Sequence, residues 1–291
     1  MRVKLSLGRV LGAVGLLAIV AGAAVAVVVR WGIYDVAATN QHSHLVYWLL
    51  DTAKRRSIAH HATDVEVPDL SDPALLRRGL ALYREHCTRC HGAPGAPPED
   101  FAKGLEPSPP NLAQVGREWP ARDIYRAVRE GIKMTGMPAW AFRLDERGLW
   151  AVVAFVRRLP ALSPAQYQAL TAGPQEGPAG KEPLAGLVAR AAPDAGYRAP
   201  QPGRGRTALR QYACIACHTA PGVSGPVTTA GPPLAGIGSR RYIAGILPNT
   251  PDNMVRWIMR PQVILPHNAM PDMGVAEPDA RDIAAYLATL R

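Results

Sequence analysis

The sequence predicts an all-α fold in which two similar domains follow an N-terminal apolar helix. Residues 10–29 contain no charged or strongly polar side chain. Several later segments place apolar residues at the three- and four-residue spacing of an amphipathic helix, and the chain between them is rich in Pro and Gly. One motif, Cys-x-x-Cys-His, occurs twice. These observations indicate helical domains that repeat one plan.

The first predicted helix, within residues 1–30, is long enough to cross a membrane. Twenty residues at about 1.5 Å each give about 30 Å, the thickness of a bilayer core. Lys and Arg precede the apolar run at three positions and follow it closely at one. The positive-inside rule then places the N-terminus in the cytoplasm and the remaining chain outside. A cleaved signal peptide is the alternative, but the apolar run continues past the small residues 21–23. We therefore favour an uncleaved single-pass anchor.

Residues 31–67 are predicted to form a juxtamembrane segment. Its apolar cluster at residues 45–50 is too short to cross the bilayer again, and its Trp and Tyr side chains suit the membrane interface. A metal or haem-ligand role is conceivable for four histidines, but we favour polar positions of a helix near the membrane: His42, His44, His60 and His61.

The first domain is predicted over residues 68–160. Ser71 or Asp72 caps a helix that begins at Pro73, and its apolar spacing continues to Tyr83. Gly79 on this helix either permits close approach of a second helix or is incidental. Further helices are predicted over residues 122–131 and 145–159.

Residues 161–203 are rich in Pro, Gly, Ala and Gln, which predicts an interdomain linker with one short helix at 184–191. The second domain, residues 204–291, repeats the order of the first, with helices at 252–259 and 279–290. The two Cys-x-x-Cys-His motifs lie 127 residues apart, and the aromatic residues of the closing helices lie 131 apart. These similar offsets indicate a duplication.

The motifs at residues 87–91 and 214–218 have the spacing of covalent c-type haem attachment sites. Each thiol forms a thioether with one vinyl group of the porphyrin, and a helical turn matches the gap between the vinyls. The following residue, His91 or His218, then lies under the iron as its proximal ligand. The predicted attachment residues are the only cysteines of the chain: Cys87, Cys90, Cys214 and Cys217.

Two other uses of a Cys-x-x-Cys pair fit the sequence less well. A redox dithiol needs a βαβ setting, and a zinc site usually needs a second pair nearby. The two pairs are far apart, and each carries its own histidine. Two haem c groups are therefore the predicted cofactors.

A methionine is predicted as the second axial ligand of each iron, because it raises the reduction potential and keeps substrate from the metal. Such a ligand should lie on an extended loop, and a following proline favours extended backbone. Met137 and Met270 are both followed by proline and both precede a closing helix. Met134 and Met273 are the alternatives. The two methionines within a predicted helix are expected in the core: Met254 and Met259.

Each proximal histidine also needs an acceptor for its outer ring N–H, which fixes the orientation of the ring. The backbone carbonyls of Pro110 and Pro232 are the candidates. Leu112 and Leu234 are expected to pack on the haems, although both stretches also suit ordinary loop packing.

With these motifs in place, both domains resemble class I cytochrome c domains over about 180 of the 291 residues. Residues 231–241, with 247–250 and Trp257-Ile258, are similar to the cytochrome c domains attached to haem–copper oxidases; the first domain fits that pattern less closely. The resemblance implies three or four helices around each haem. It is imperfect, because the aromatic residue before the first motif is Tyr83, whereas its counterpart is Arg210, with Tyr212 as a substitute from another position.

These features together predict an electron carrier of a respiratory chain. It would lie at a bacterial inner membrane with its haem domains in the periplasm, accept electrons from a quinol-oxidising complex or a soluble carrier, and pass them to a terminal oxidase. No catalytic residue is predicted. The alternatives are the cytochrome subunit of a periplasmic dehydrogenase and a dihaem peroxidase, which would need an iron with an open coordination position.

The net charge of +10 bears on the partner. Residues 1–63 contribute +5 and residues 204–291 contribute +4. Since no compact run of Lys and Arg is present, we expect an acidic docking surface on a redox protein rather than nucleic acid.

Overall fold

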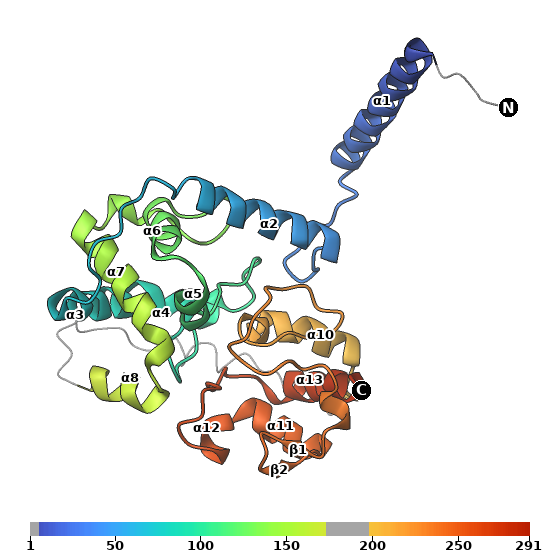
Figure 1. Ribbon diagram of the computed structural model, residues 1–291. Coiled ribbons are helices and arrows are strands. Elements are labelled where there is room, and N and C mark those ends of the chain that lie inside the picture. The colour runs from blue at the N-terminus through green and yellow to red at the C-terminus, as the bar shows by residue number, and fades with distance from the viewer. Residues whose placement is uncertain (1–5, 173–197) are drawn as a thin grey trace. The chain divides into compact units, whose positions relative to one another are not determined.

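The computed structural model describes residues 6–172 and 198–291 (Figure 1). The chain divides into two compact units, Met1–Asn40 and Gln41–Arg291. The first unit contains α1 (Leu7–Trp31), whose described side chains are all exposed. Among the described residues, α1 is the helix whose length and apolar composition fit a membrane crossing. A signal sequence near an N-terminus has the same properties.

The second unit begins within the predicted juxtamembrane segment. Ser43 caps α2 (His44–His60), because its hydroxyl accepts a hydrogen bond from the Val46 amide at 3.4 Å. After the helix, Ala62 is fully buried and Val65 packs against the first domain's core. The compact fold therefore starts before residue 68, which was the first residue of the domain predicted from the sequence.

The first domain is helical, as predicted. Asp72, not Ser71, caps its first helix, because Asp72 Oδ1 accepts from the Ala74 amide at 2.8 Å. The predicted helices at 122–131 and 145–159 are present as α6 and α7. In chain order the helical elements are α3 (Pro73–Leu82), η1 (Tyr83–Cys87), α4 (Thr88–His91), η2 (Asp100–Ala102), α5 (Leu112–Glu118), α6 (Ala121–Glu130), η3 (Trp140–Phe142), α7 (Glu146–Arg158), η4 (Leu159–Ala161) and α8 (Pro164–Thr171).

The helix α8 extends the first domain beyond residue 160. Ser163 and Gln166 form a reciprocal capping box at its start, and Tyr167 is buried in the core with Tyr83 and Phe155. The Pro- and Ala-rich composition of this segment masked the capping signal. The helix predicted at 184–191 lies outside the described residues.

The second domain repeats the helical plan and adds a small hairpin. Its elements are α10 (Pro202–Gln211), η5 (Cys214–Ala216), η6 (Ile237–Ser239), β1 (Tyr242–Ile243), β2 (Leu247–Pro248), α11 (Pro251–Met259), α12 (Pro261–Ile264) and α13 (Glu277–Thr289). The strands are antiparallel, with Tyr242 opposite Pro248. Left-handed backbone at Ala244 and Gly245 makes the turn between them. The sequence did not predict these strands.

In each domain the first helix crosses the last, α3 on α7 and α10 on α13 (Figure 1). Glycine makes both crossings possible. A Cβ added at Gly79 would lie 2.0 Å from Ala151 O, and one at Gly205 would lie 2.0 Å from Asp282 O. The close approach suggested by Gly79 is thus present, and Gly205 is its equivalent in the second domain. Met254 is buried in the second core and Met259 packs against it, as predicted.

The two glycines of α10 offer a matched test of this packing. Gly205→Ala is expected to lower the free energy of unfolding of the second domain by about 1–3 kcal/mol, because a methyl group must displace backbone. Gly203→Ala, with nothing within 4 Å of its added Cβ, should leave stability unchanged or raise it by up to about 1 kcal/mol. Thermal unfolding followed by circular dichroism measures both. If both substitutions change the free energy of unfolding equally, the crossing of α10 and α13 can accommodate a methyl group at Gly205.

Candidate haem sites

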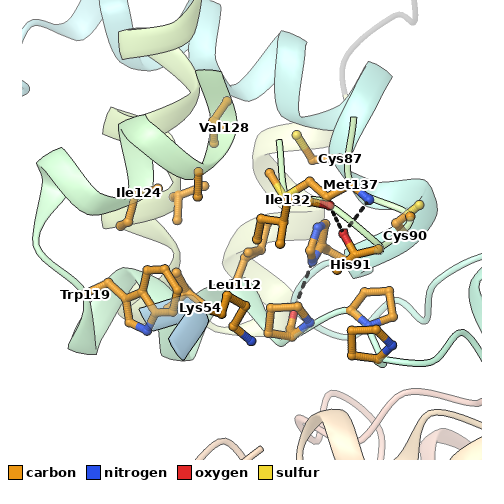
Figure 2. Close-up of a pocket in the computed structure, with 18 of the residues that line it drawn as sticks. Lys54, Cys87, Cys90, His91, Leu112, Trp119, Ile124, Val128, Ile132 and Met137 are labelled. Atoms are coloured by element: carbon orange, nitrogen blue, oxygen red, sulfur yellow. Dashed lines mark hydrogen bonds between the residues drawn. The ribbon is translucent and has the colours of Figure 1, made fainter. Parts of the chain in front are cut away.

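The first domain gathers its predicted site residues around one pocket (Figure 2). The helix α3 passes through the π-helical turn η1 into α4, which places Cys87 at the end of η1 and Cys90 and His91 together in α4. The pocket is also lined by residues far away in the sequence, Met137 among them. The further predicted residues that line it are Pro110 and Leu112.

A proline carbonyl orients the proximal histidine. His91 Nδ1 lies 2.9 Å from Pro110 O. Because a carbonyl oxygen only accepts, Nδ1 carries the hydrogen and Nε2 keeps a lone pair for a metal. Burial lowers the pKa of His91, against the opposing effect of this hydrogen bond. The imidazole is therefore neutral at pH 7, as a metal ligand must be.

The Met137 loop is fixed by its own backbone. The Ile132 amide donates to Met137 O at 3.1 Å, and the Met137 amide donates to Thr135 Oγ1 at 3.1 Å. Gly131 begins the loop with φ at +66°, and a Cβ there would lie 2.6 Å from Pro138 C. The alternative ligand, Met134, is 94% exposed and does not line the pocket.

Apolar side chains form most of the pocket wall. They come from the residue after α5, from α6 and α7, and from the segment between α6 and α7, and include Trp119, Ile124, Val128, Ile132, Trp140, Leu144, Val152 and Val156. Two thiols, a neutral imidazole, a thioether and an apolar wall at one pocket fit a covalently attached haem. Polar residues of α2 also line it, a contribution that the sequence did not predict.

The thiols differ from those of a redox dithiol. Burial, the largest cause, raises the pKa of Cys87 and of Cys214 to about 12. Burial also raises the pKa of Cys90 and of Cys217. A reactive dithiol instead depends on a lowered thiol pKa, so the electrostatics favour attachment over thiol exchange.

The second site repeats the histidine arrangement. His218 Nδ1 lies 2.7 Å from Pro232 O, and burial lowers the pKa of His218 against this hydrogen bond. Gly231 lies close against the ring, since a Cβ there would lie 2.6 Å from His218 Cε1. Leu234 packs against the same core as Cys214.

Met270 lies on the loop between α12 and α13. Met270 is half-buried, and its backbone is held by Asn268, whose side chain accepts from the Met270 amide at 2.7 Å. The alternative, Met273, is buried in the second core, against which Cys214 and Leu234 pack. The geometry therefore leaves two candidate ligands for the second iron.

The two domains differ at the position four residues before the first cysteine of each motif, which is Tyr83 in one and Arg210 in the other. Tyr83 donates from its hydroxyl to Gly92 O at 2.8 Å and packs on Phe155, with ring centroids 5.2 Å apart. Its counterpart, Arg210, is 3% exposed and forms an ion pair with Glu106 of the first domain. Tyr212 packs against the second core, and its hydroxyl donates to Asp279 Oδ2 at 2.8 Å.

The two sites are in contact through Asn111. Its Oδ1 caps α5, and its Nδ2 donates to Cys217 Sγ at 3.3 Å. Asn111 directly follows Pro110, the acceptor of the His91 ring. Pro226 of the second domain also lines the first pocket. The sequence did not predict this contact, because nothing in the local pattern relates residue 111 to residue 217.

Helical domains built around a Cys-x-x-Cys-His turn and a histidine held by a proline carbonyl are those of cytochromes c. Comparison with known families agrees. Residues 74–156 match the family "cytochrome c oxidase, cbb3-type, subunit III", and residues 203–291 match the family "cytochrome c". The chain thus carries two cytochrome c-type domains and is related to oxidase-associated cytochromes. The predicted fold class is confirmed.

One curated relative is cytochrome c oxidase subunit 2 of Alkalihalophilus pseudofirmus. It is 37% identical over 89 residues, which are 30% of this chain and 25% of the relative. The chain therefore spans about a quarter of that protein. No solved structure matches the chain. Cytochrome c domains bind haem c and transfer electrons, so these two properties extend to this protein.

Proposed function

We propose that this protein is a dihaem electron carrier that is anchored to the bacterial inner membrane by α1 and delivers electrons to a terminal oxidase from the periplasmic side. Cys87 and Cys90 hold the first haem, and Cys214 and Cys217 the second. His91 and His218 are the proximal ligands. When bound, each haem supplies a one-electron iron couple.

The contact between the two sites carries this proposal. Asn111 bonds to a thiol of one site and follows the carbonyl that orients the histidine of the other. Electron transfer within one chain requires redox groups that lie close together, and this contact between the two sites supports such proximity. Met137 and Met270 are proposed to occupy the distal positions, which would exclude peroxide from both irons.

An oxidase as the electron acceptor is supported by the comparisons. One matched family and the curated relative are both oxidase subunits by name. The net charge of +4 over residues 204–291 suits an acidic docking surface. A quinol-oxidising complex or a soluble carrier is the proposed donor.

Oxidation by a purified haem–copper oxidase tests the proposal. Reduced full-length protein should be oxidised in air only when the oxidase is present, and cyanide should stop the reaction. The rate should fall between about 0.1 M and 1 M salt, because the Debye length shrinks from about 10 Å to about 3 Å. Failure of electron transfer, together with co-purification of a quinoprotein or molybdoenzyme, would assign the protein to a dehydrogenase instead. A high-spin, five-coordinate haem that reacts with peroxide would make it a peroxidase.

A further inference from the structure

The helix α2 lies outside both regions that match known families, residues 74–156 and 203–291. Nevertheless, it contributes a set of polar side chains to the first haem pocket. They are spaced four, three and one residues apart, which places them along one face of the helix. These residues are Tyr47, Asp51, Lys54 and Arg55.

The orientation of a haem in this pocket is limited by its attachment. Thioethers at Cys87 and Cys90 fix the vinyl edge of the porphyrin, and the two propionates project from the opposite edge. Figure 2 shows Lys54 and Trp119 well separated from both cysteines across the pocket. Carboxylates at such a site need cations or hydrogen-bond donors, because burial of an unpaired charge is costly.

The pocket face of α2 has the charge and the donors for this task. Lys54 Nζ lies 2.7 Å from Asp51 Oδ1, and Arg55 Nε lies 2.9 Å from Asp51 Oδ2. Two cations thus share one carboxylate, which leaves a net charge of +1. Arg55 is also placed over the Trp119 ring, with Cζ 5.4 Å from the centroid.

Tyr47 adds a neutral donor. Burial, followed by the charge of Asp51, raises the pKa of its hydroxyl, so the O–H remains protonated. Burial alone would raise the pKa of Asp51, but hydrogen bonds and charge from Lys54, together with Arg55, lower it. Asp51 is therefore ionised at neutral pH and competes with any other anion for the two cations.

We propose that α2 completes the first haem site by binding the propionates of the haem through Lys54, Arg55 and Tyr47. This inference rests on the proposed function, since it requires haem in the first domain. It gives the segment next to the anchor a cofactor-binding role, and it explains why these polar side chains line a pocket whose other walls are mostly apolar.

Charge substitutions on α2 test the proposal in the full-length haem-loaded protein. Lys54→Gln should shift one of the two redox waves to lower potential, because loss of a nearby cation stabilises Fe(III). Asp51→Asn should shift the same wave to higher potential. Arg56→Gln is the matched control: Arg56 lies on the same helix, is exposed and does not line the pocket. It should shift neither wave comparably.

Resonance Raman spectroscopy supplies a second readout, because propionate bending bands respond to hydrogen bonds at the carboxylates. Lys54→Gln and Tyr47→Phe should change these bands, and Arg56→Gln should not. Covalent haem content, measured after denaturation, separates the possible failures. A chain without covalent haem would overturn the proposed function itself. Two haems per chain, with Lys54→Gln indistinguishable from Arg56→Gln in both readouts, would overturn only the role of α2.

Discussion

A chain in which Cys214 and Cys217 are both replaced by alanine is expected to retain one covalently bound haem, against two in the native protein. The two thioethers are the only covalent links that the second domain offers, because the chain has no other cysteines beyond Cys87 and Cys90. Pyridine haemochrome absorbance per mole of protein, after acid–acetone extraction of unbound pigment, measures the ratio.

The reciprocal change, Cys87→Ala with Cys90→Ala, should also leave one haem, but a different one. The remaining redox wave should therefore differ between the two double variants, and the two waves together should resemble the native titration. A native chain whose pigment is wholly extracted by acid–acetone would contradict both haem assignments. A double variant that still holds two haems would contradict the assignment of its own motif.

Met137→Ala is expected to abolish the near-infrared sulfur-to-iron band of one haem and to lower its reduction potential. Methionine sulfur stabilises Fe(II), and its loss opens the distal position. The control is Met134→Ala, because Met134 lies three residues away, with its side chain 94% exposed. It should retain the band. If the band survives in Met137→Ala and disappears in Met134→Ala, the loop binds the iron through the other residue.

The same spectrum decides between the two methionines of the second domain. We propose Met270, because its following proline repeats the arrangement of Met137. Met270→Ala should then remove the second near-infrared band, and Met273→Ala should retain it while destabilising the core in which Met273 is buried. The opposite result would assign the second iron to Met273.

Local signals in the sequence were sufficient for most of the helices. A capping aspartate before Pro73, apolar side chains at helical spacing and loops rich in Pro and Gly each act within a few residues of where they occur. For the same reason the motifs identified both candidate haem sites. The hydrogen bonds from His91 to Pro110 and from His218 to Pro232 join residues within a single domain.

Contacts between distant segments could not be predicted in this way. Periodicity shows that a helix buries one face, but it does not show what covers that face. The segment containing α2 was therefore interpreted as membrane-proximal, although Tyr47 and Lys54 line the first pocket. His42 and His44 do not line the first pocket. The His42 carbonyl accepts a hydrogen bond from Ser224 Oγ, at 3.0 Å, in the second domain. These contacts of the segment before residue 68 are visible only in the tertiary structure.

The buried ion pair of Arg210 and Glu106 has a consequence for how the two domains depend on each other. The guanidinium of Arg210 is buried in one domain, whereas its counterion, Glu106, belongs to the other. Removal of Glu106 alone would leave this buried cation without its counterion, at a cost of about 3–5 kcal/mol. Each domain therefore supplies one half of a buried charge pair, which favours a single jointed body over two independently diffusing shuttles.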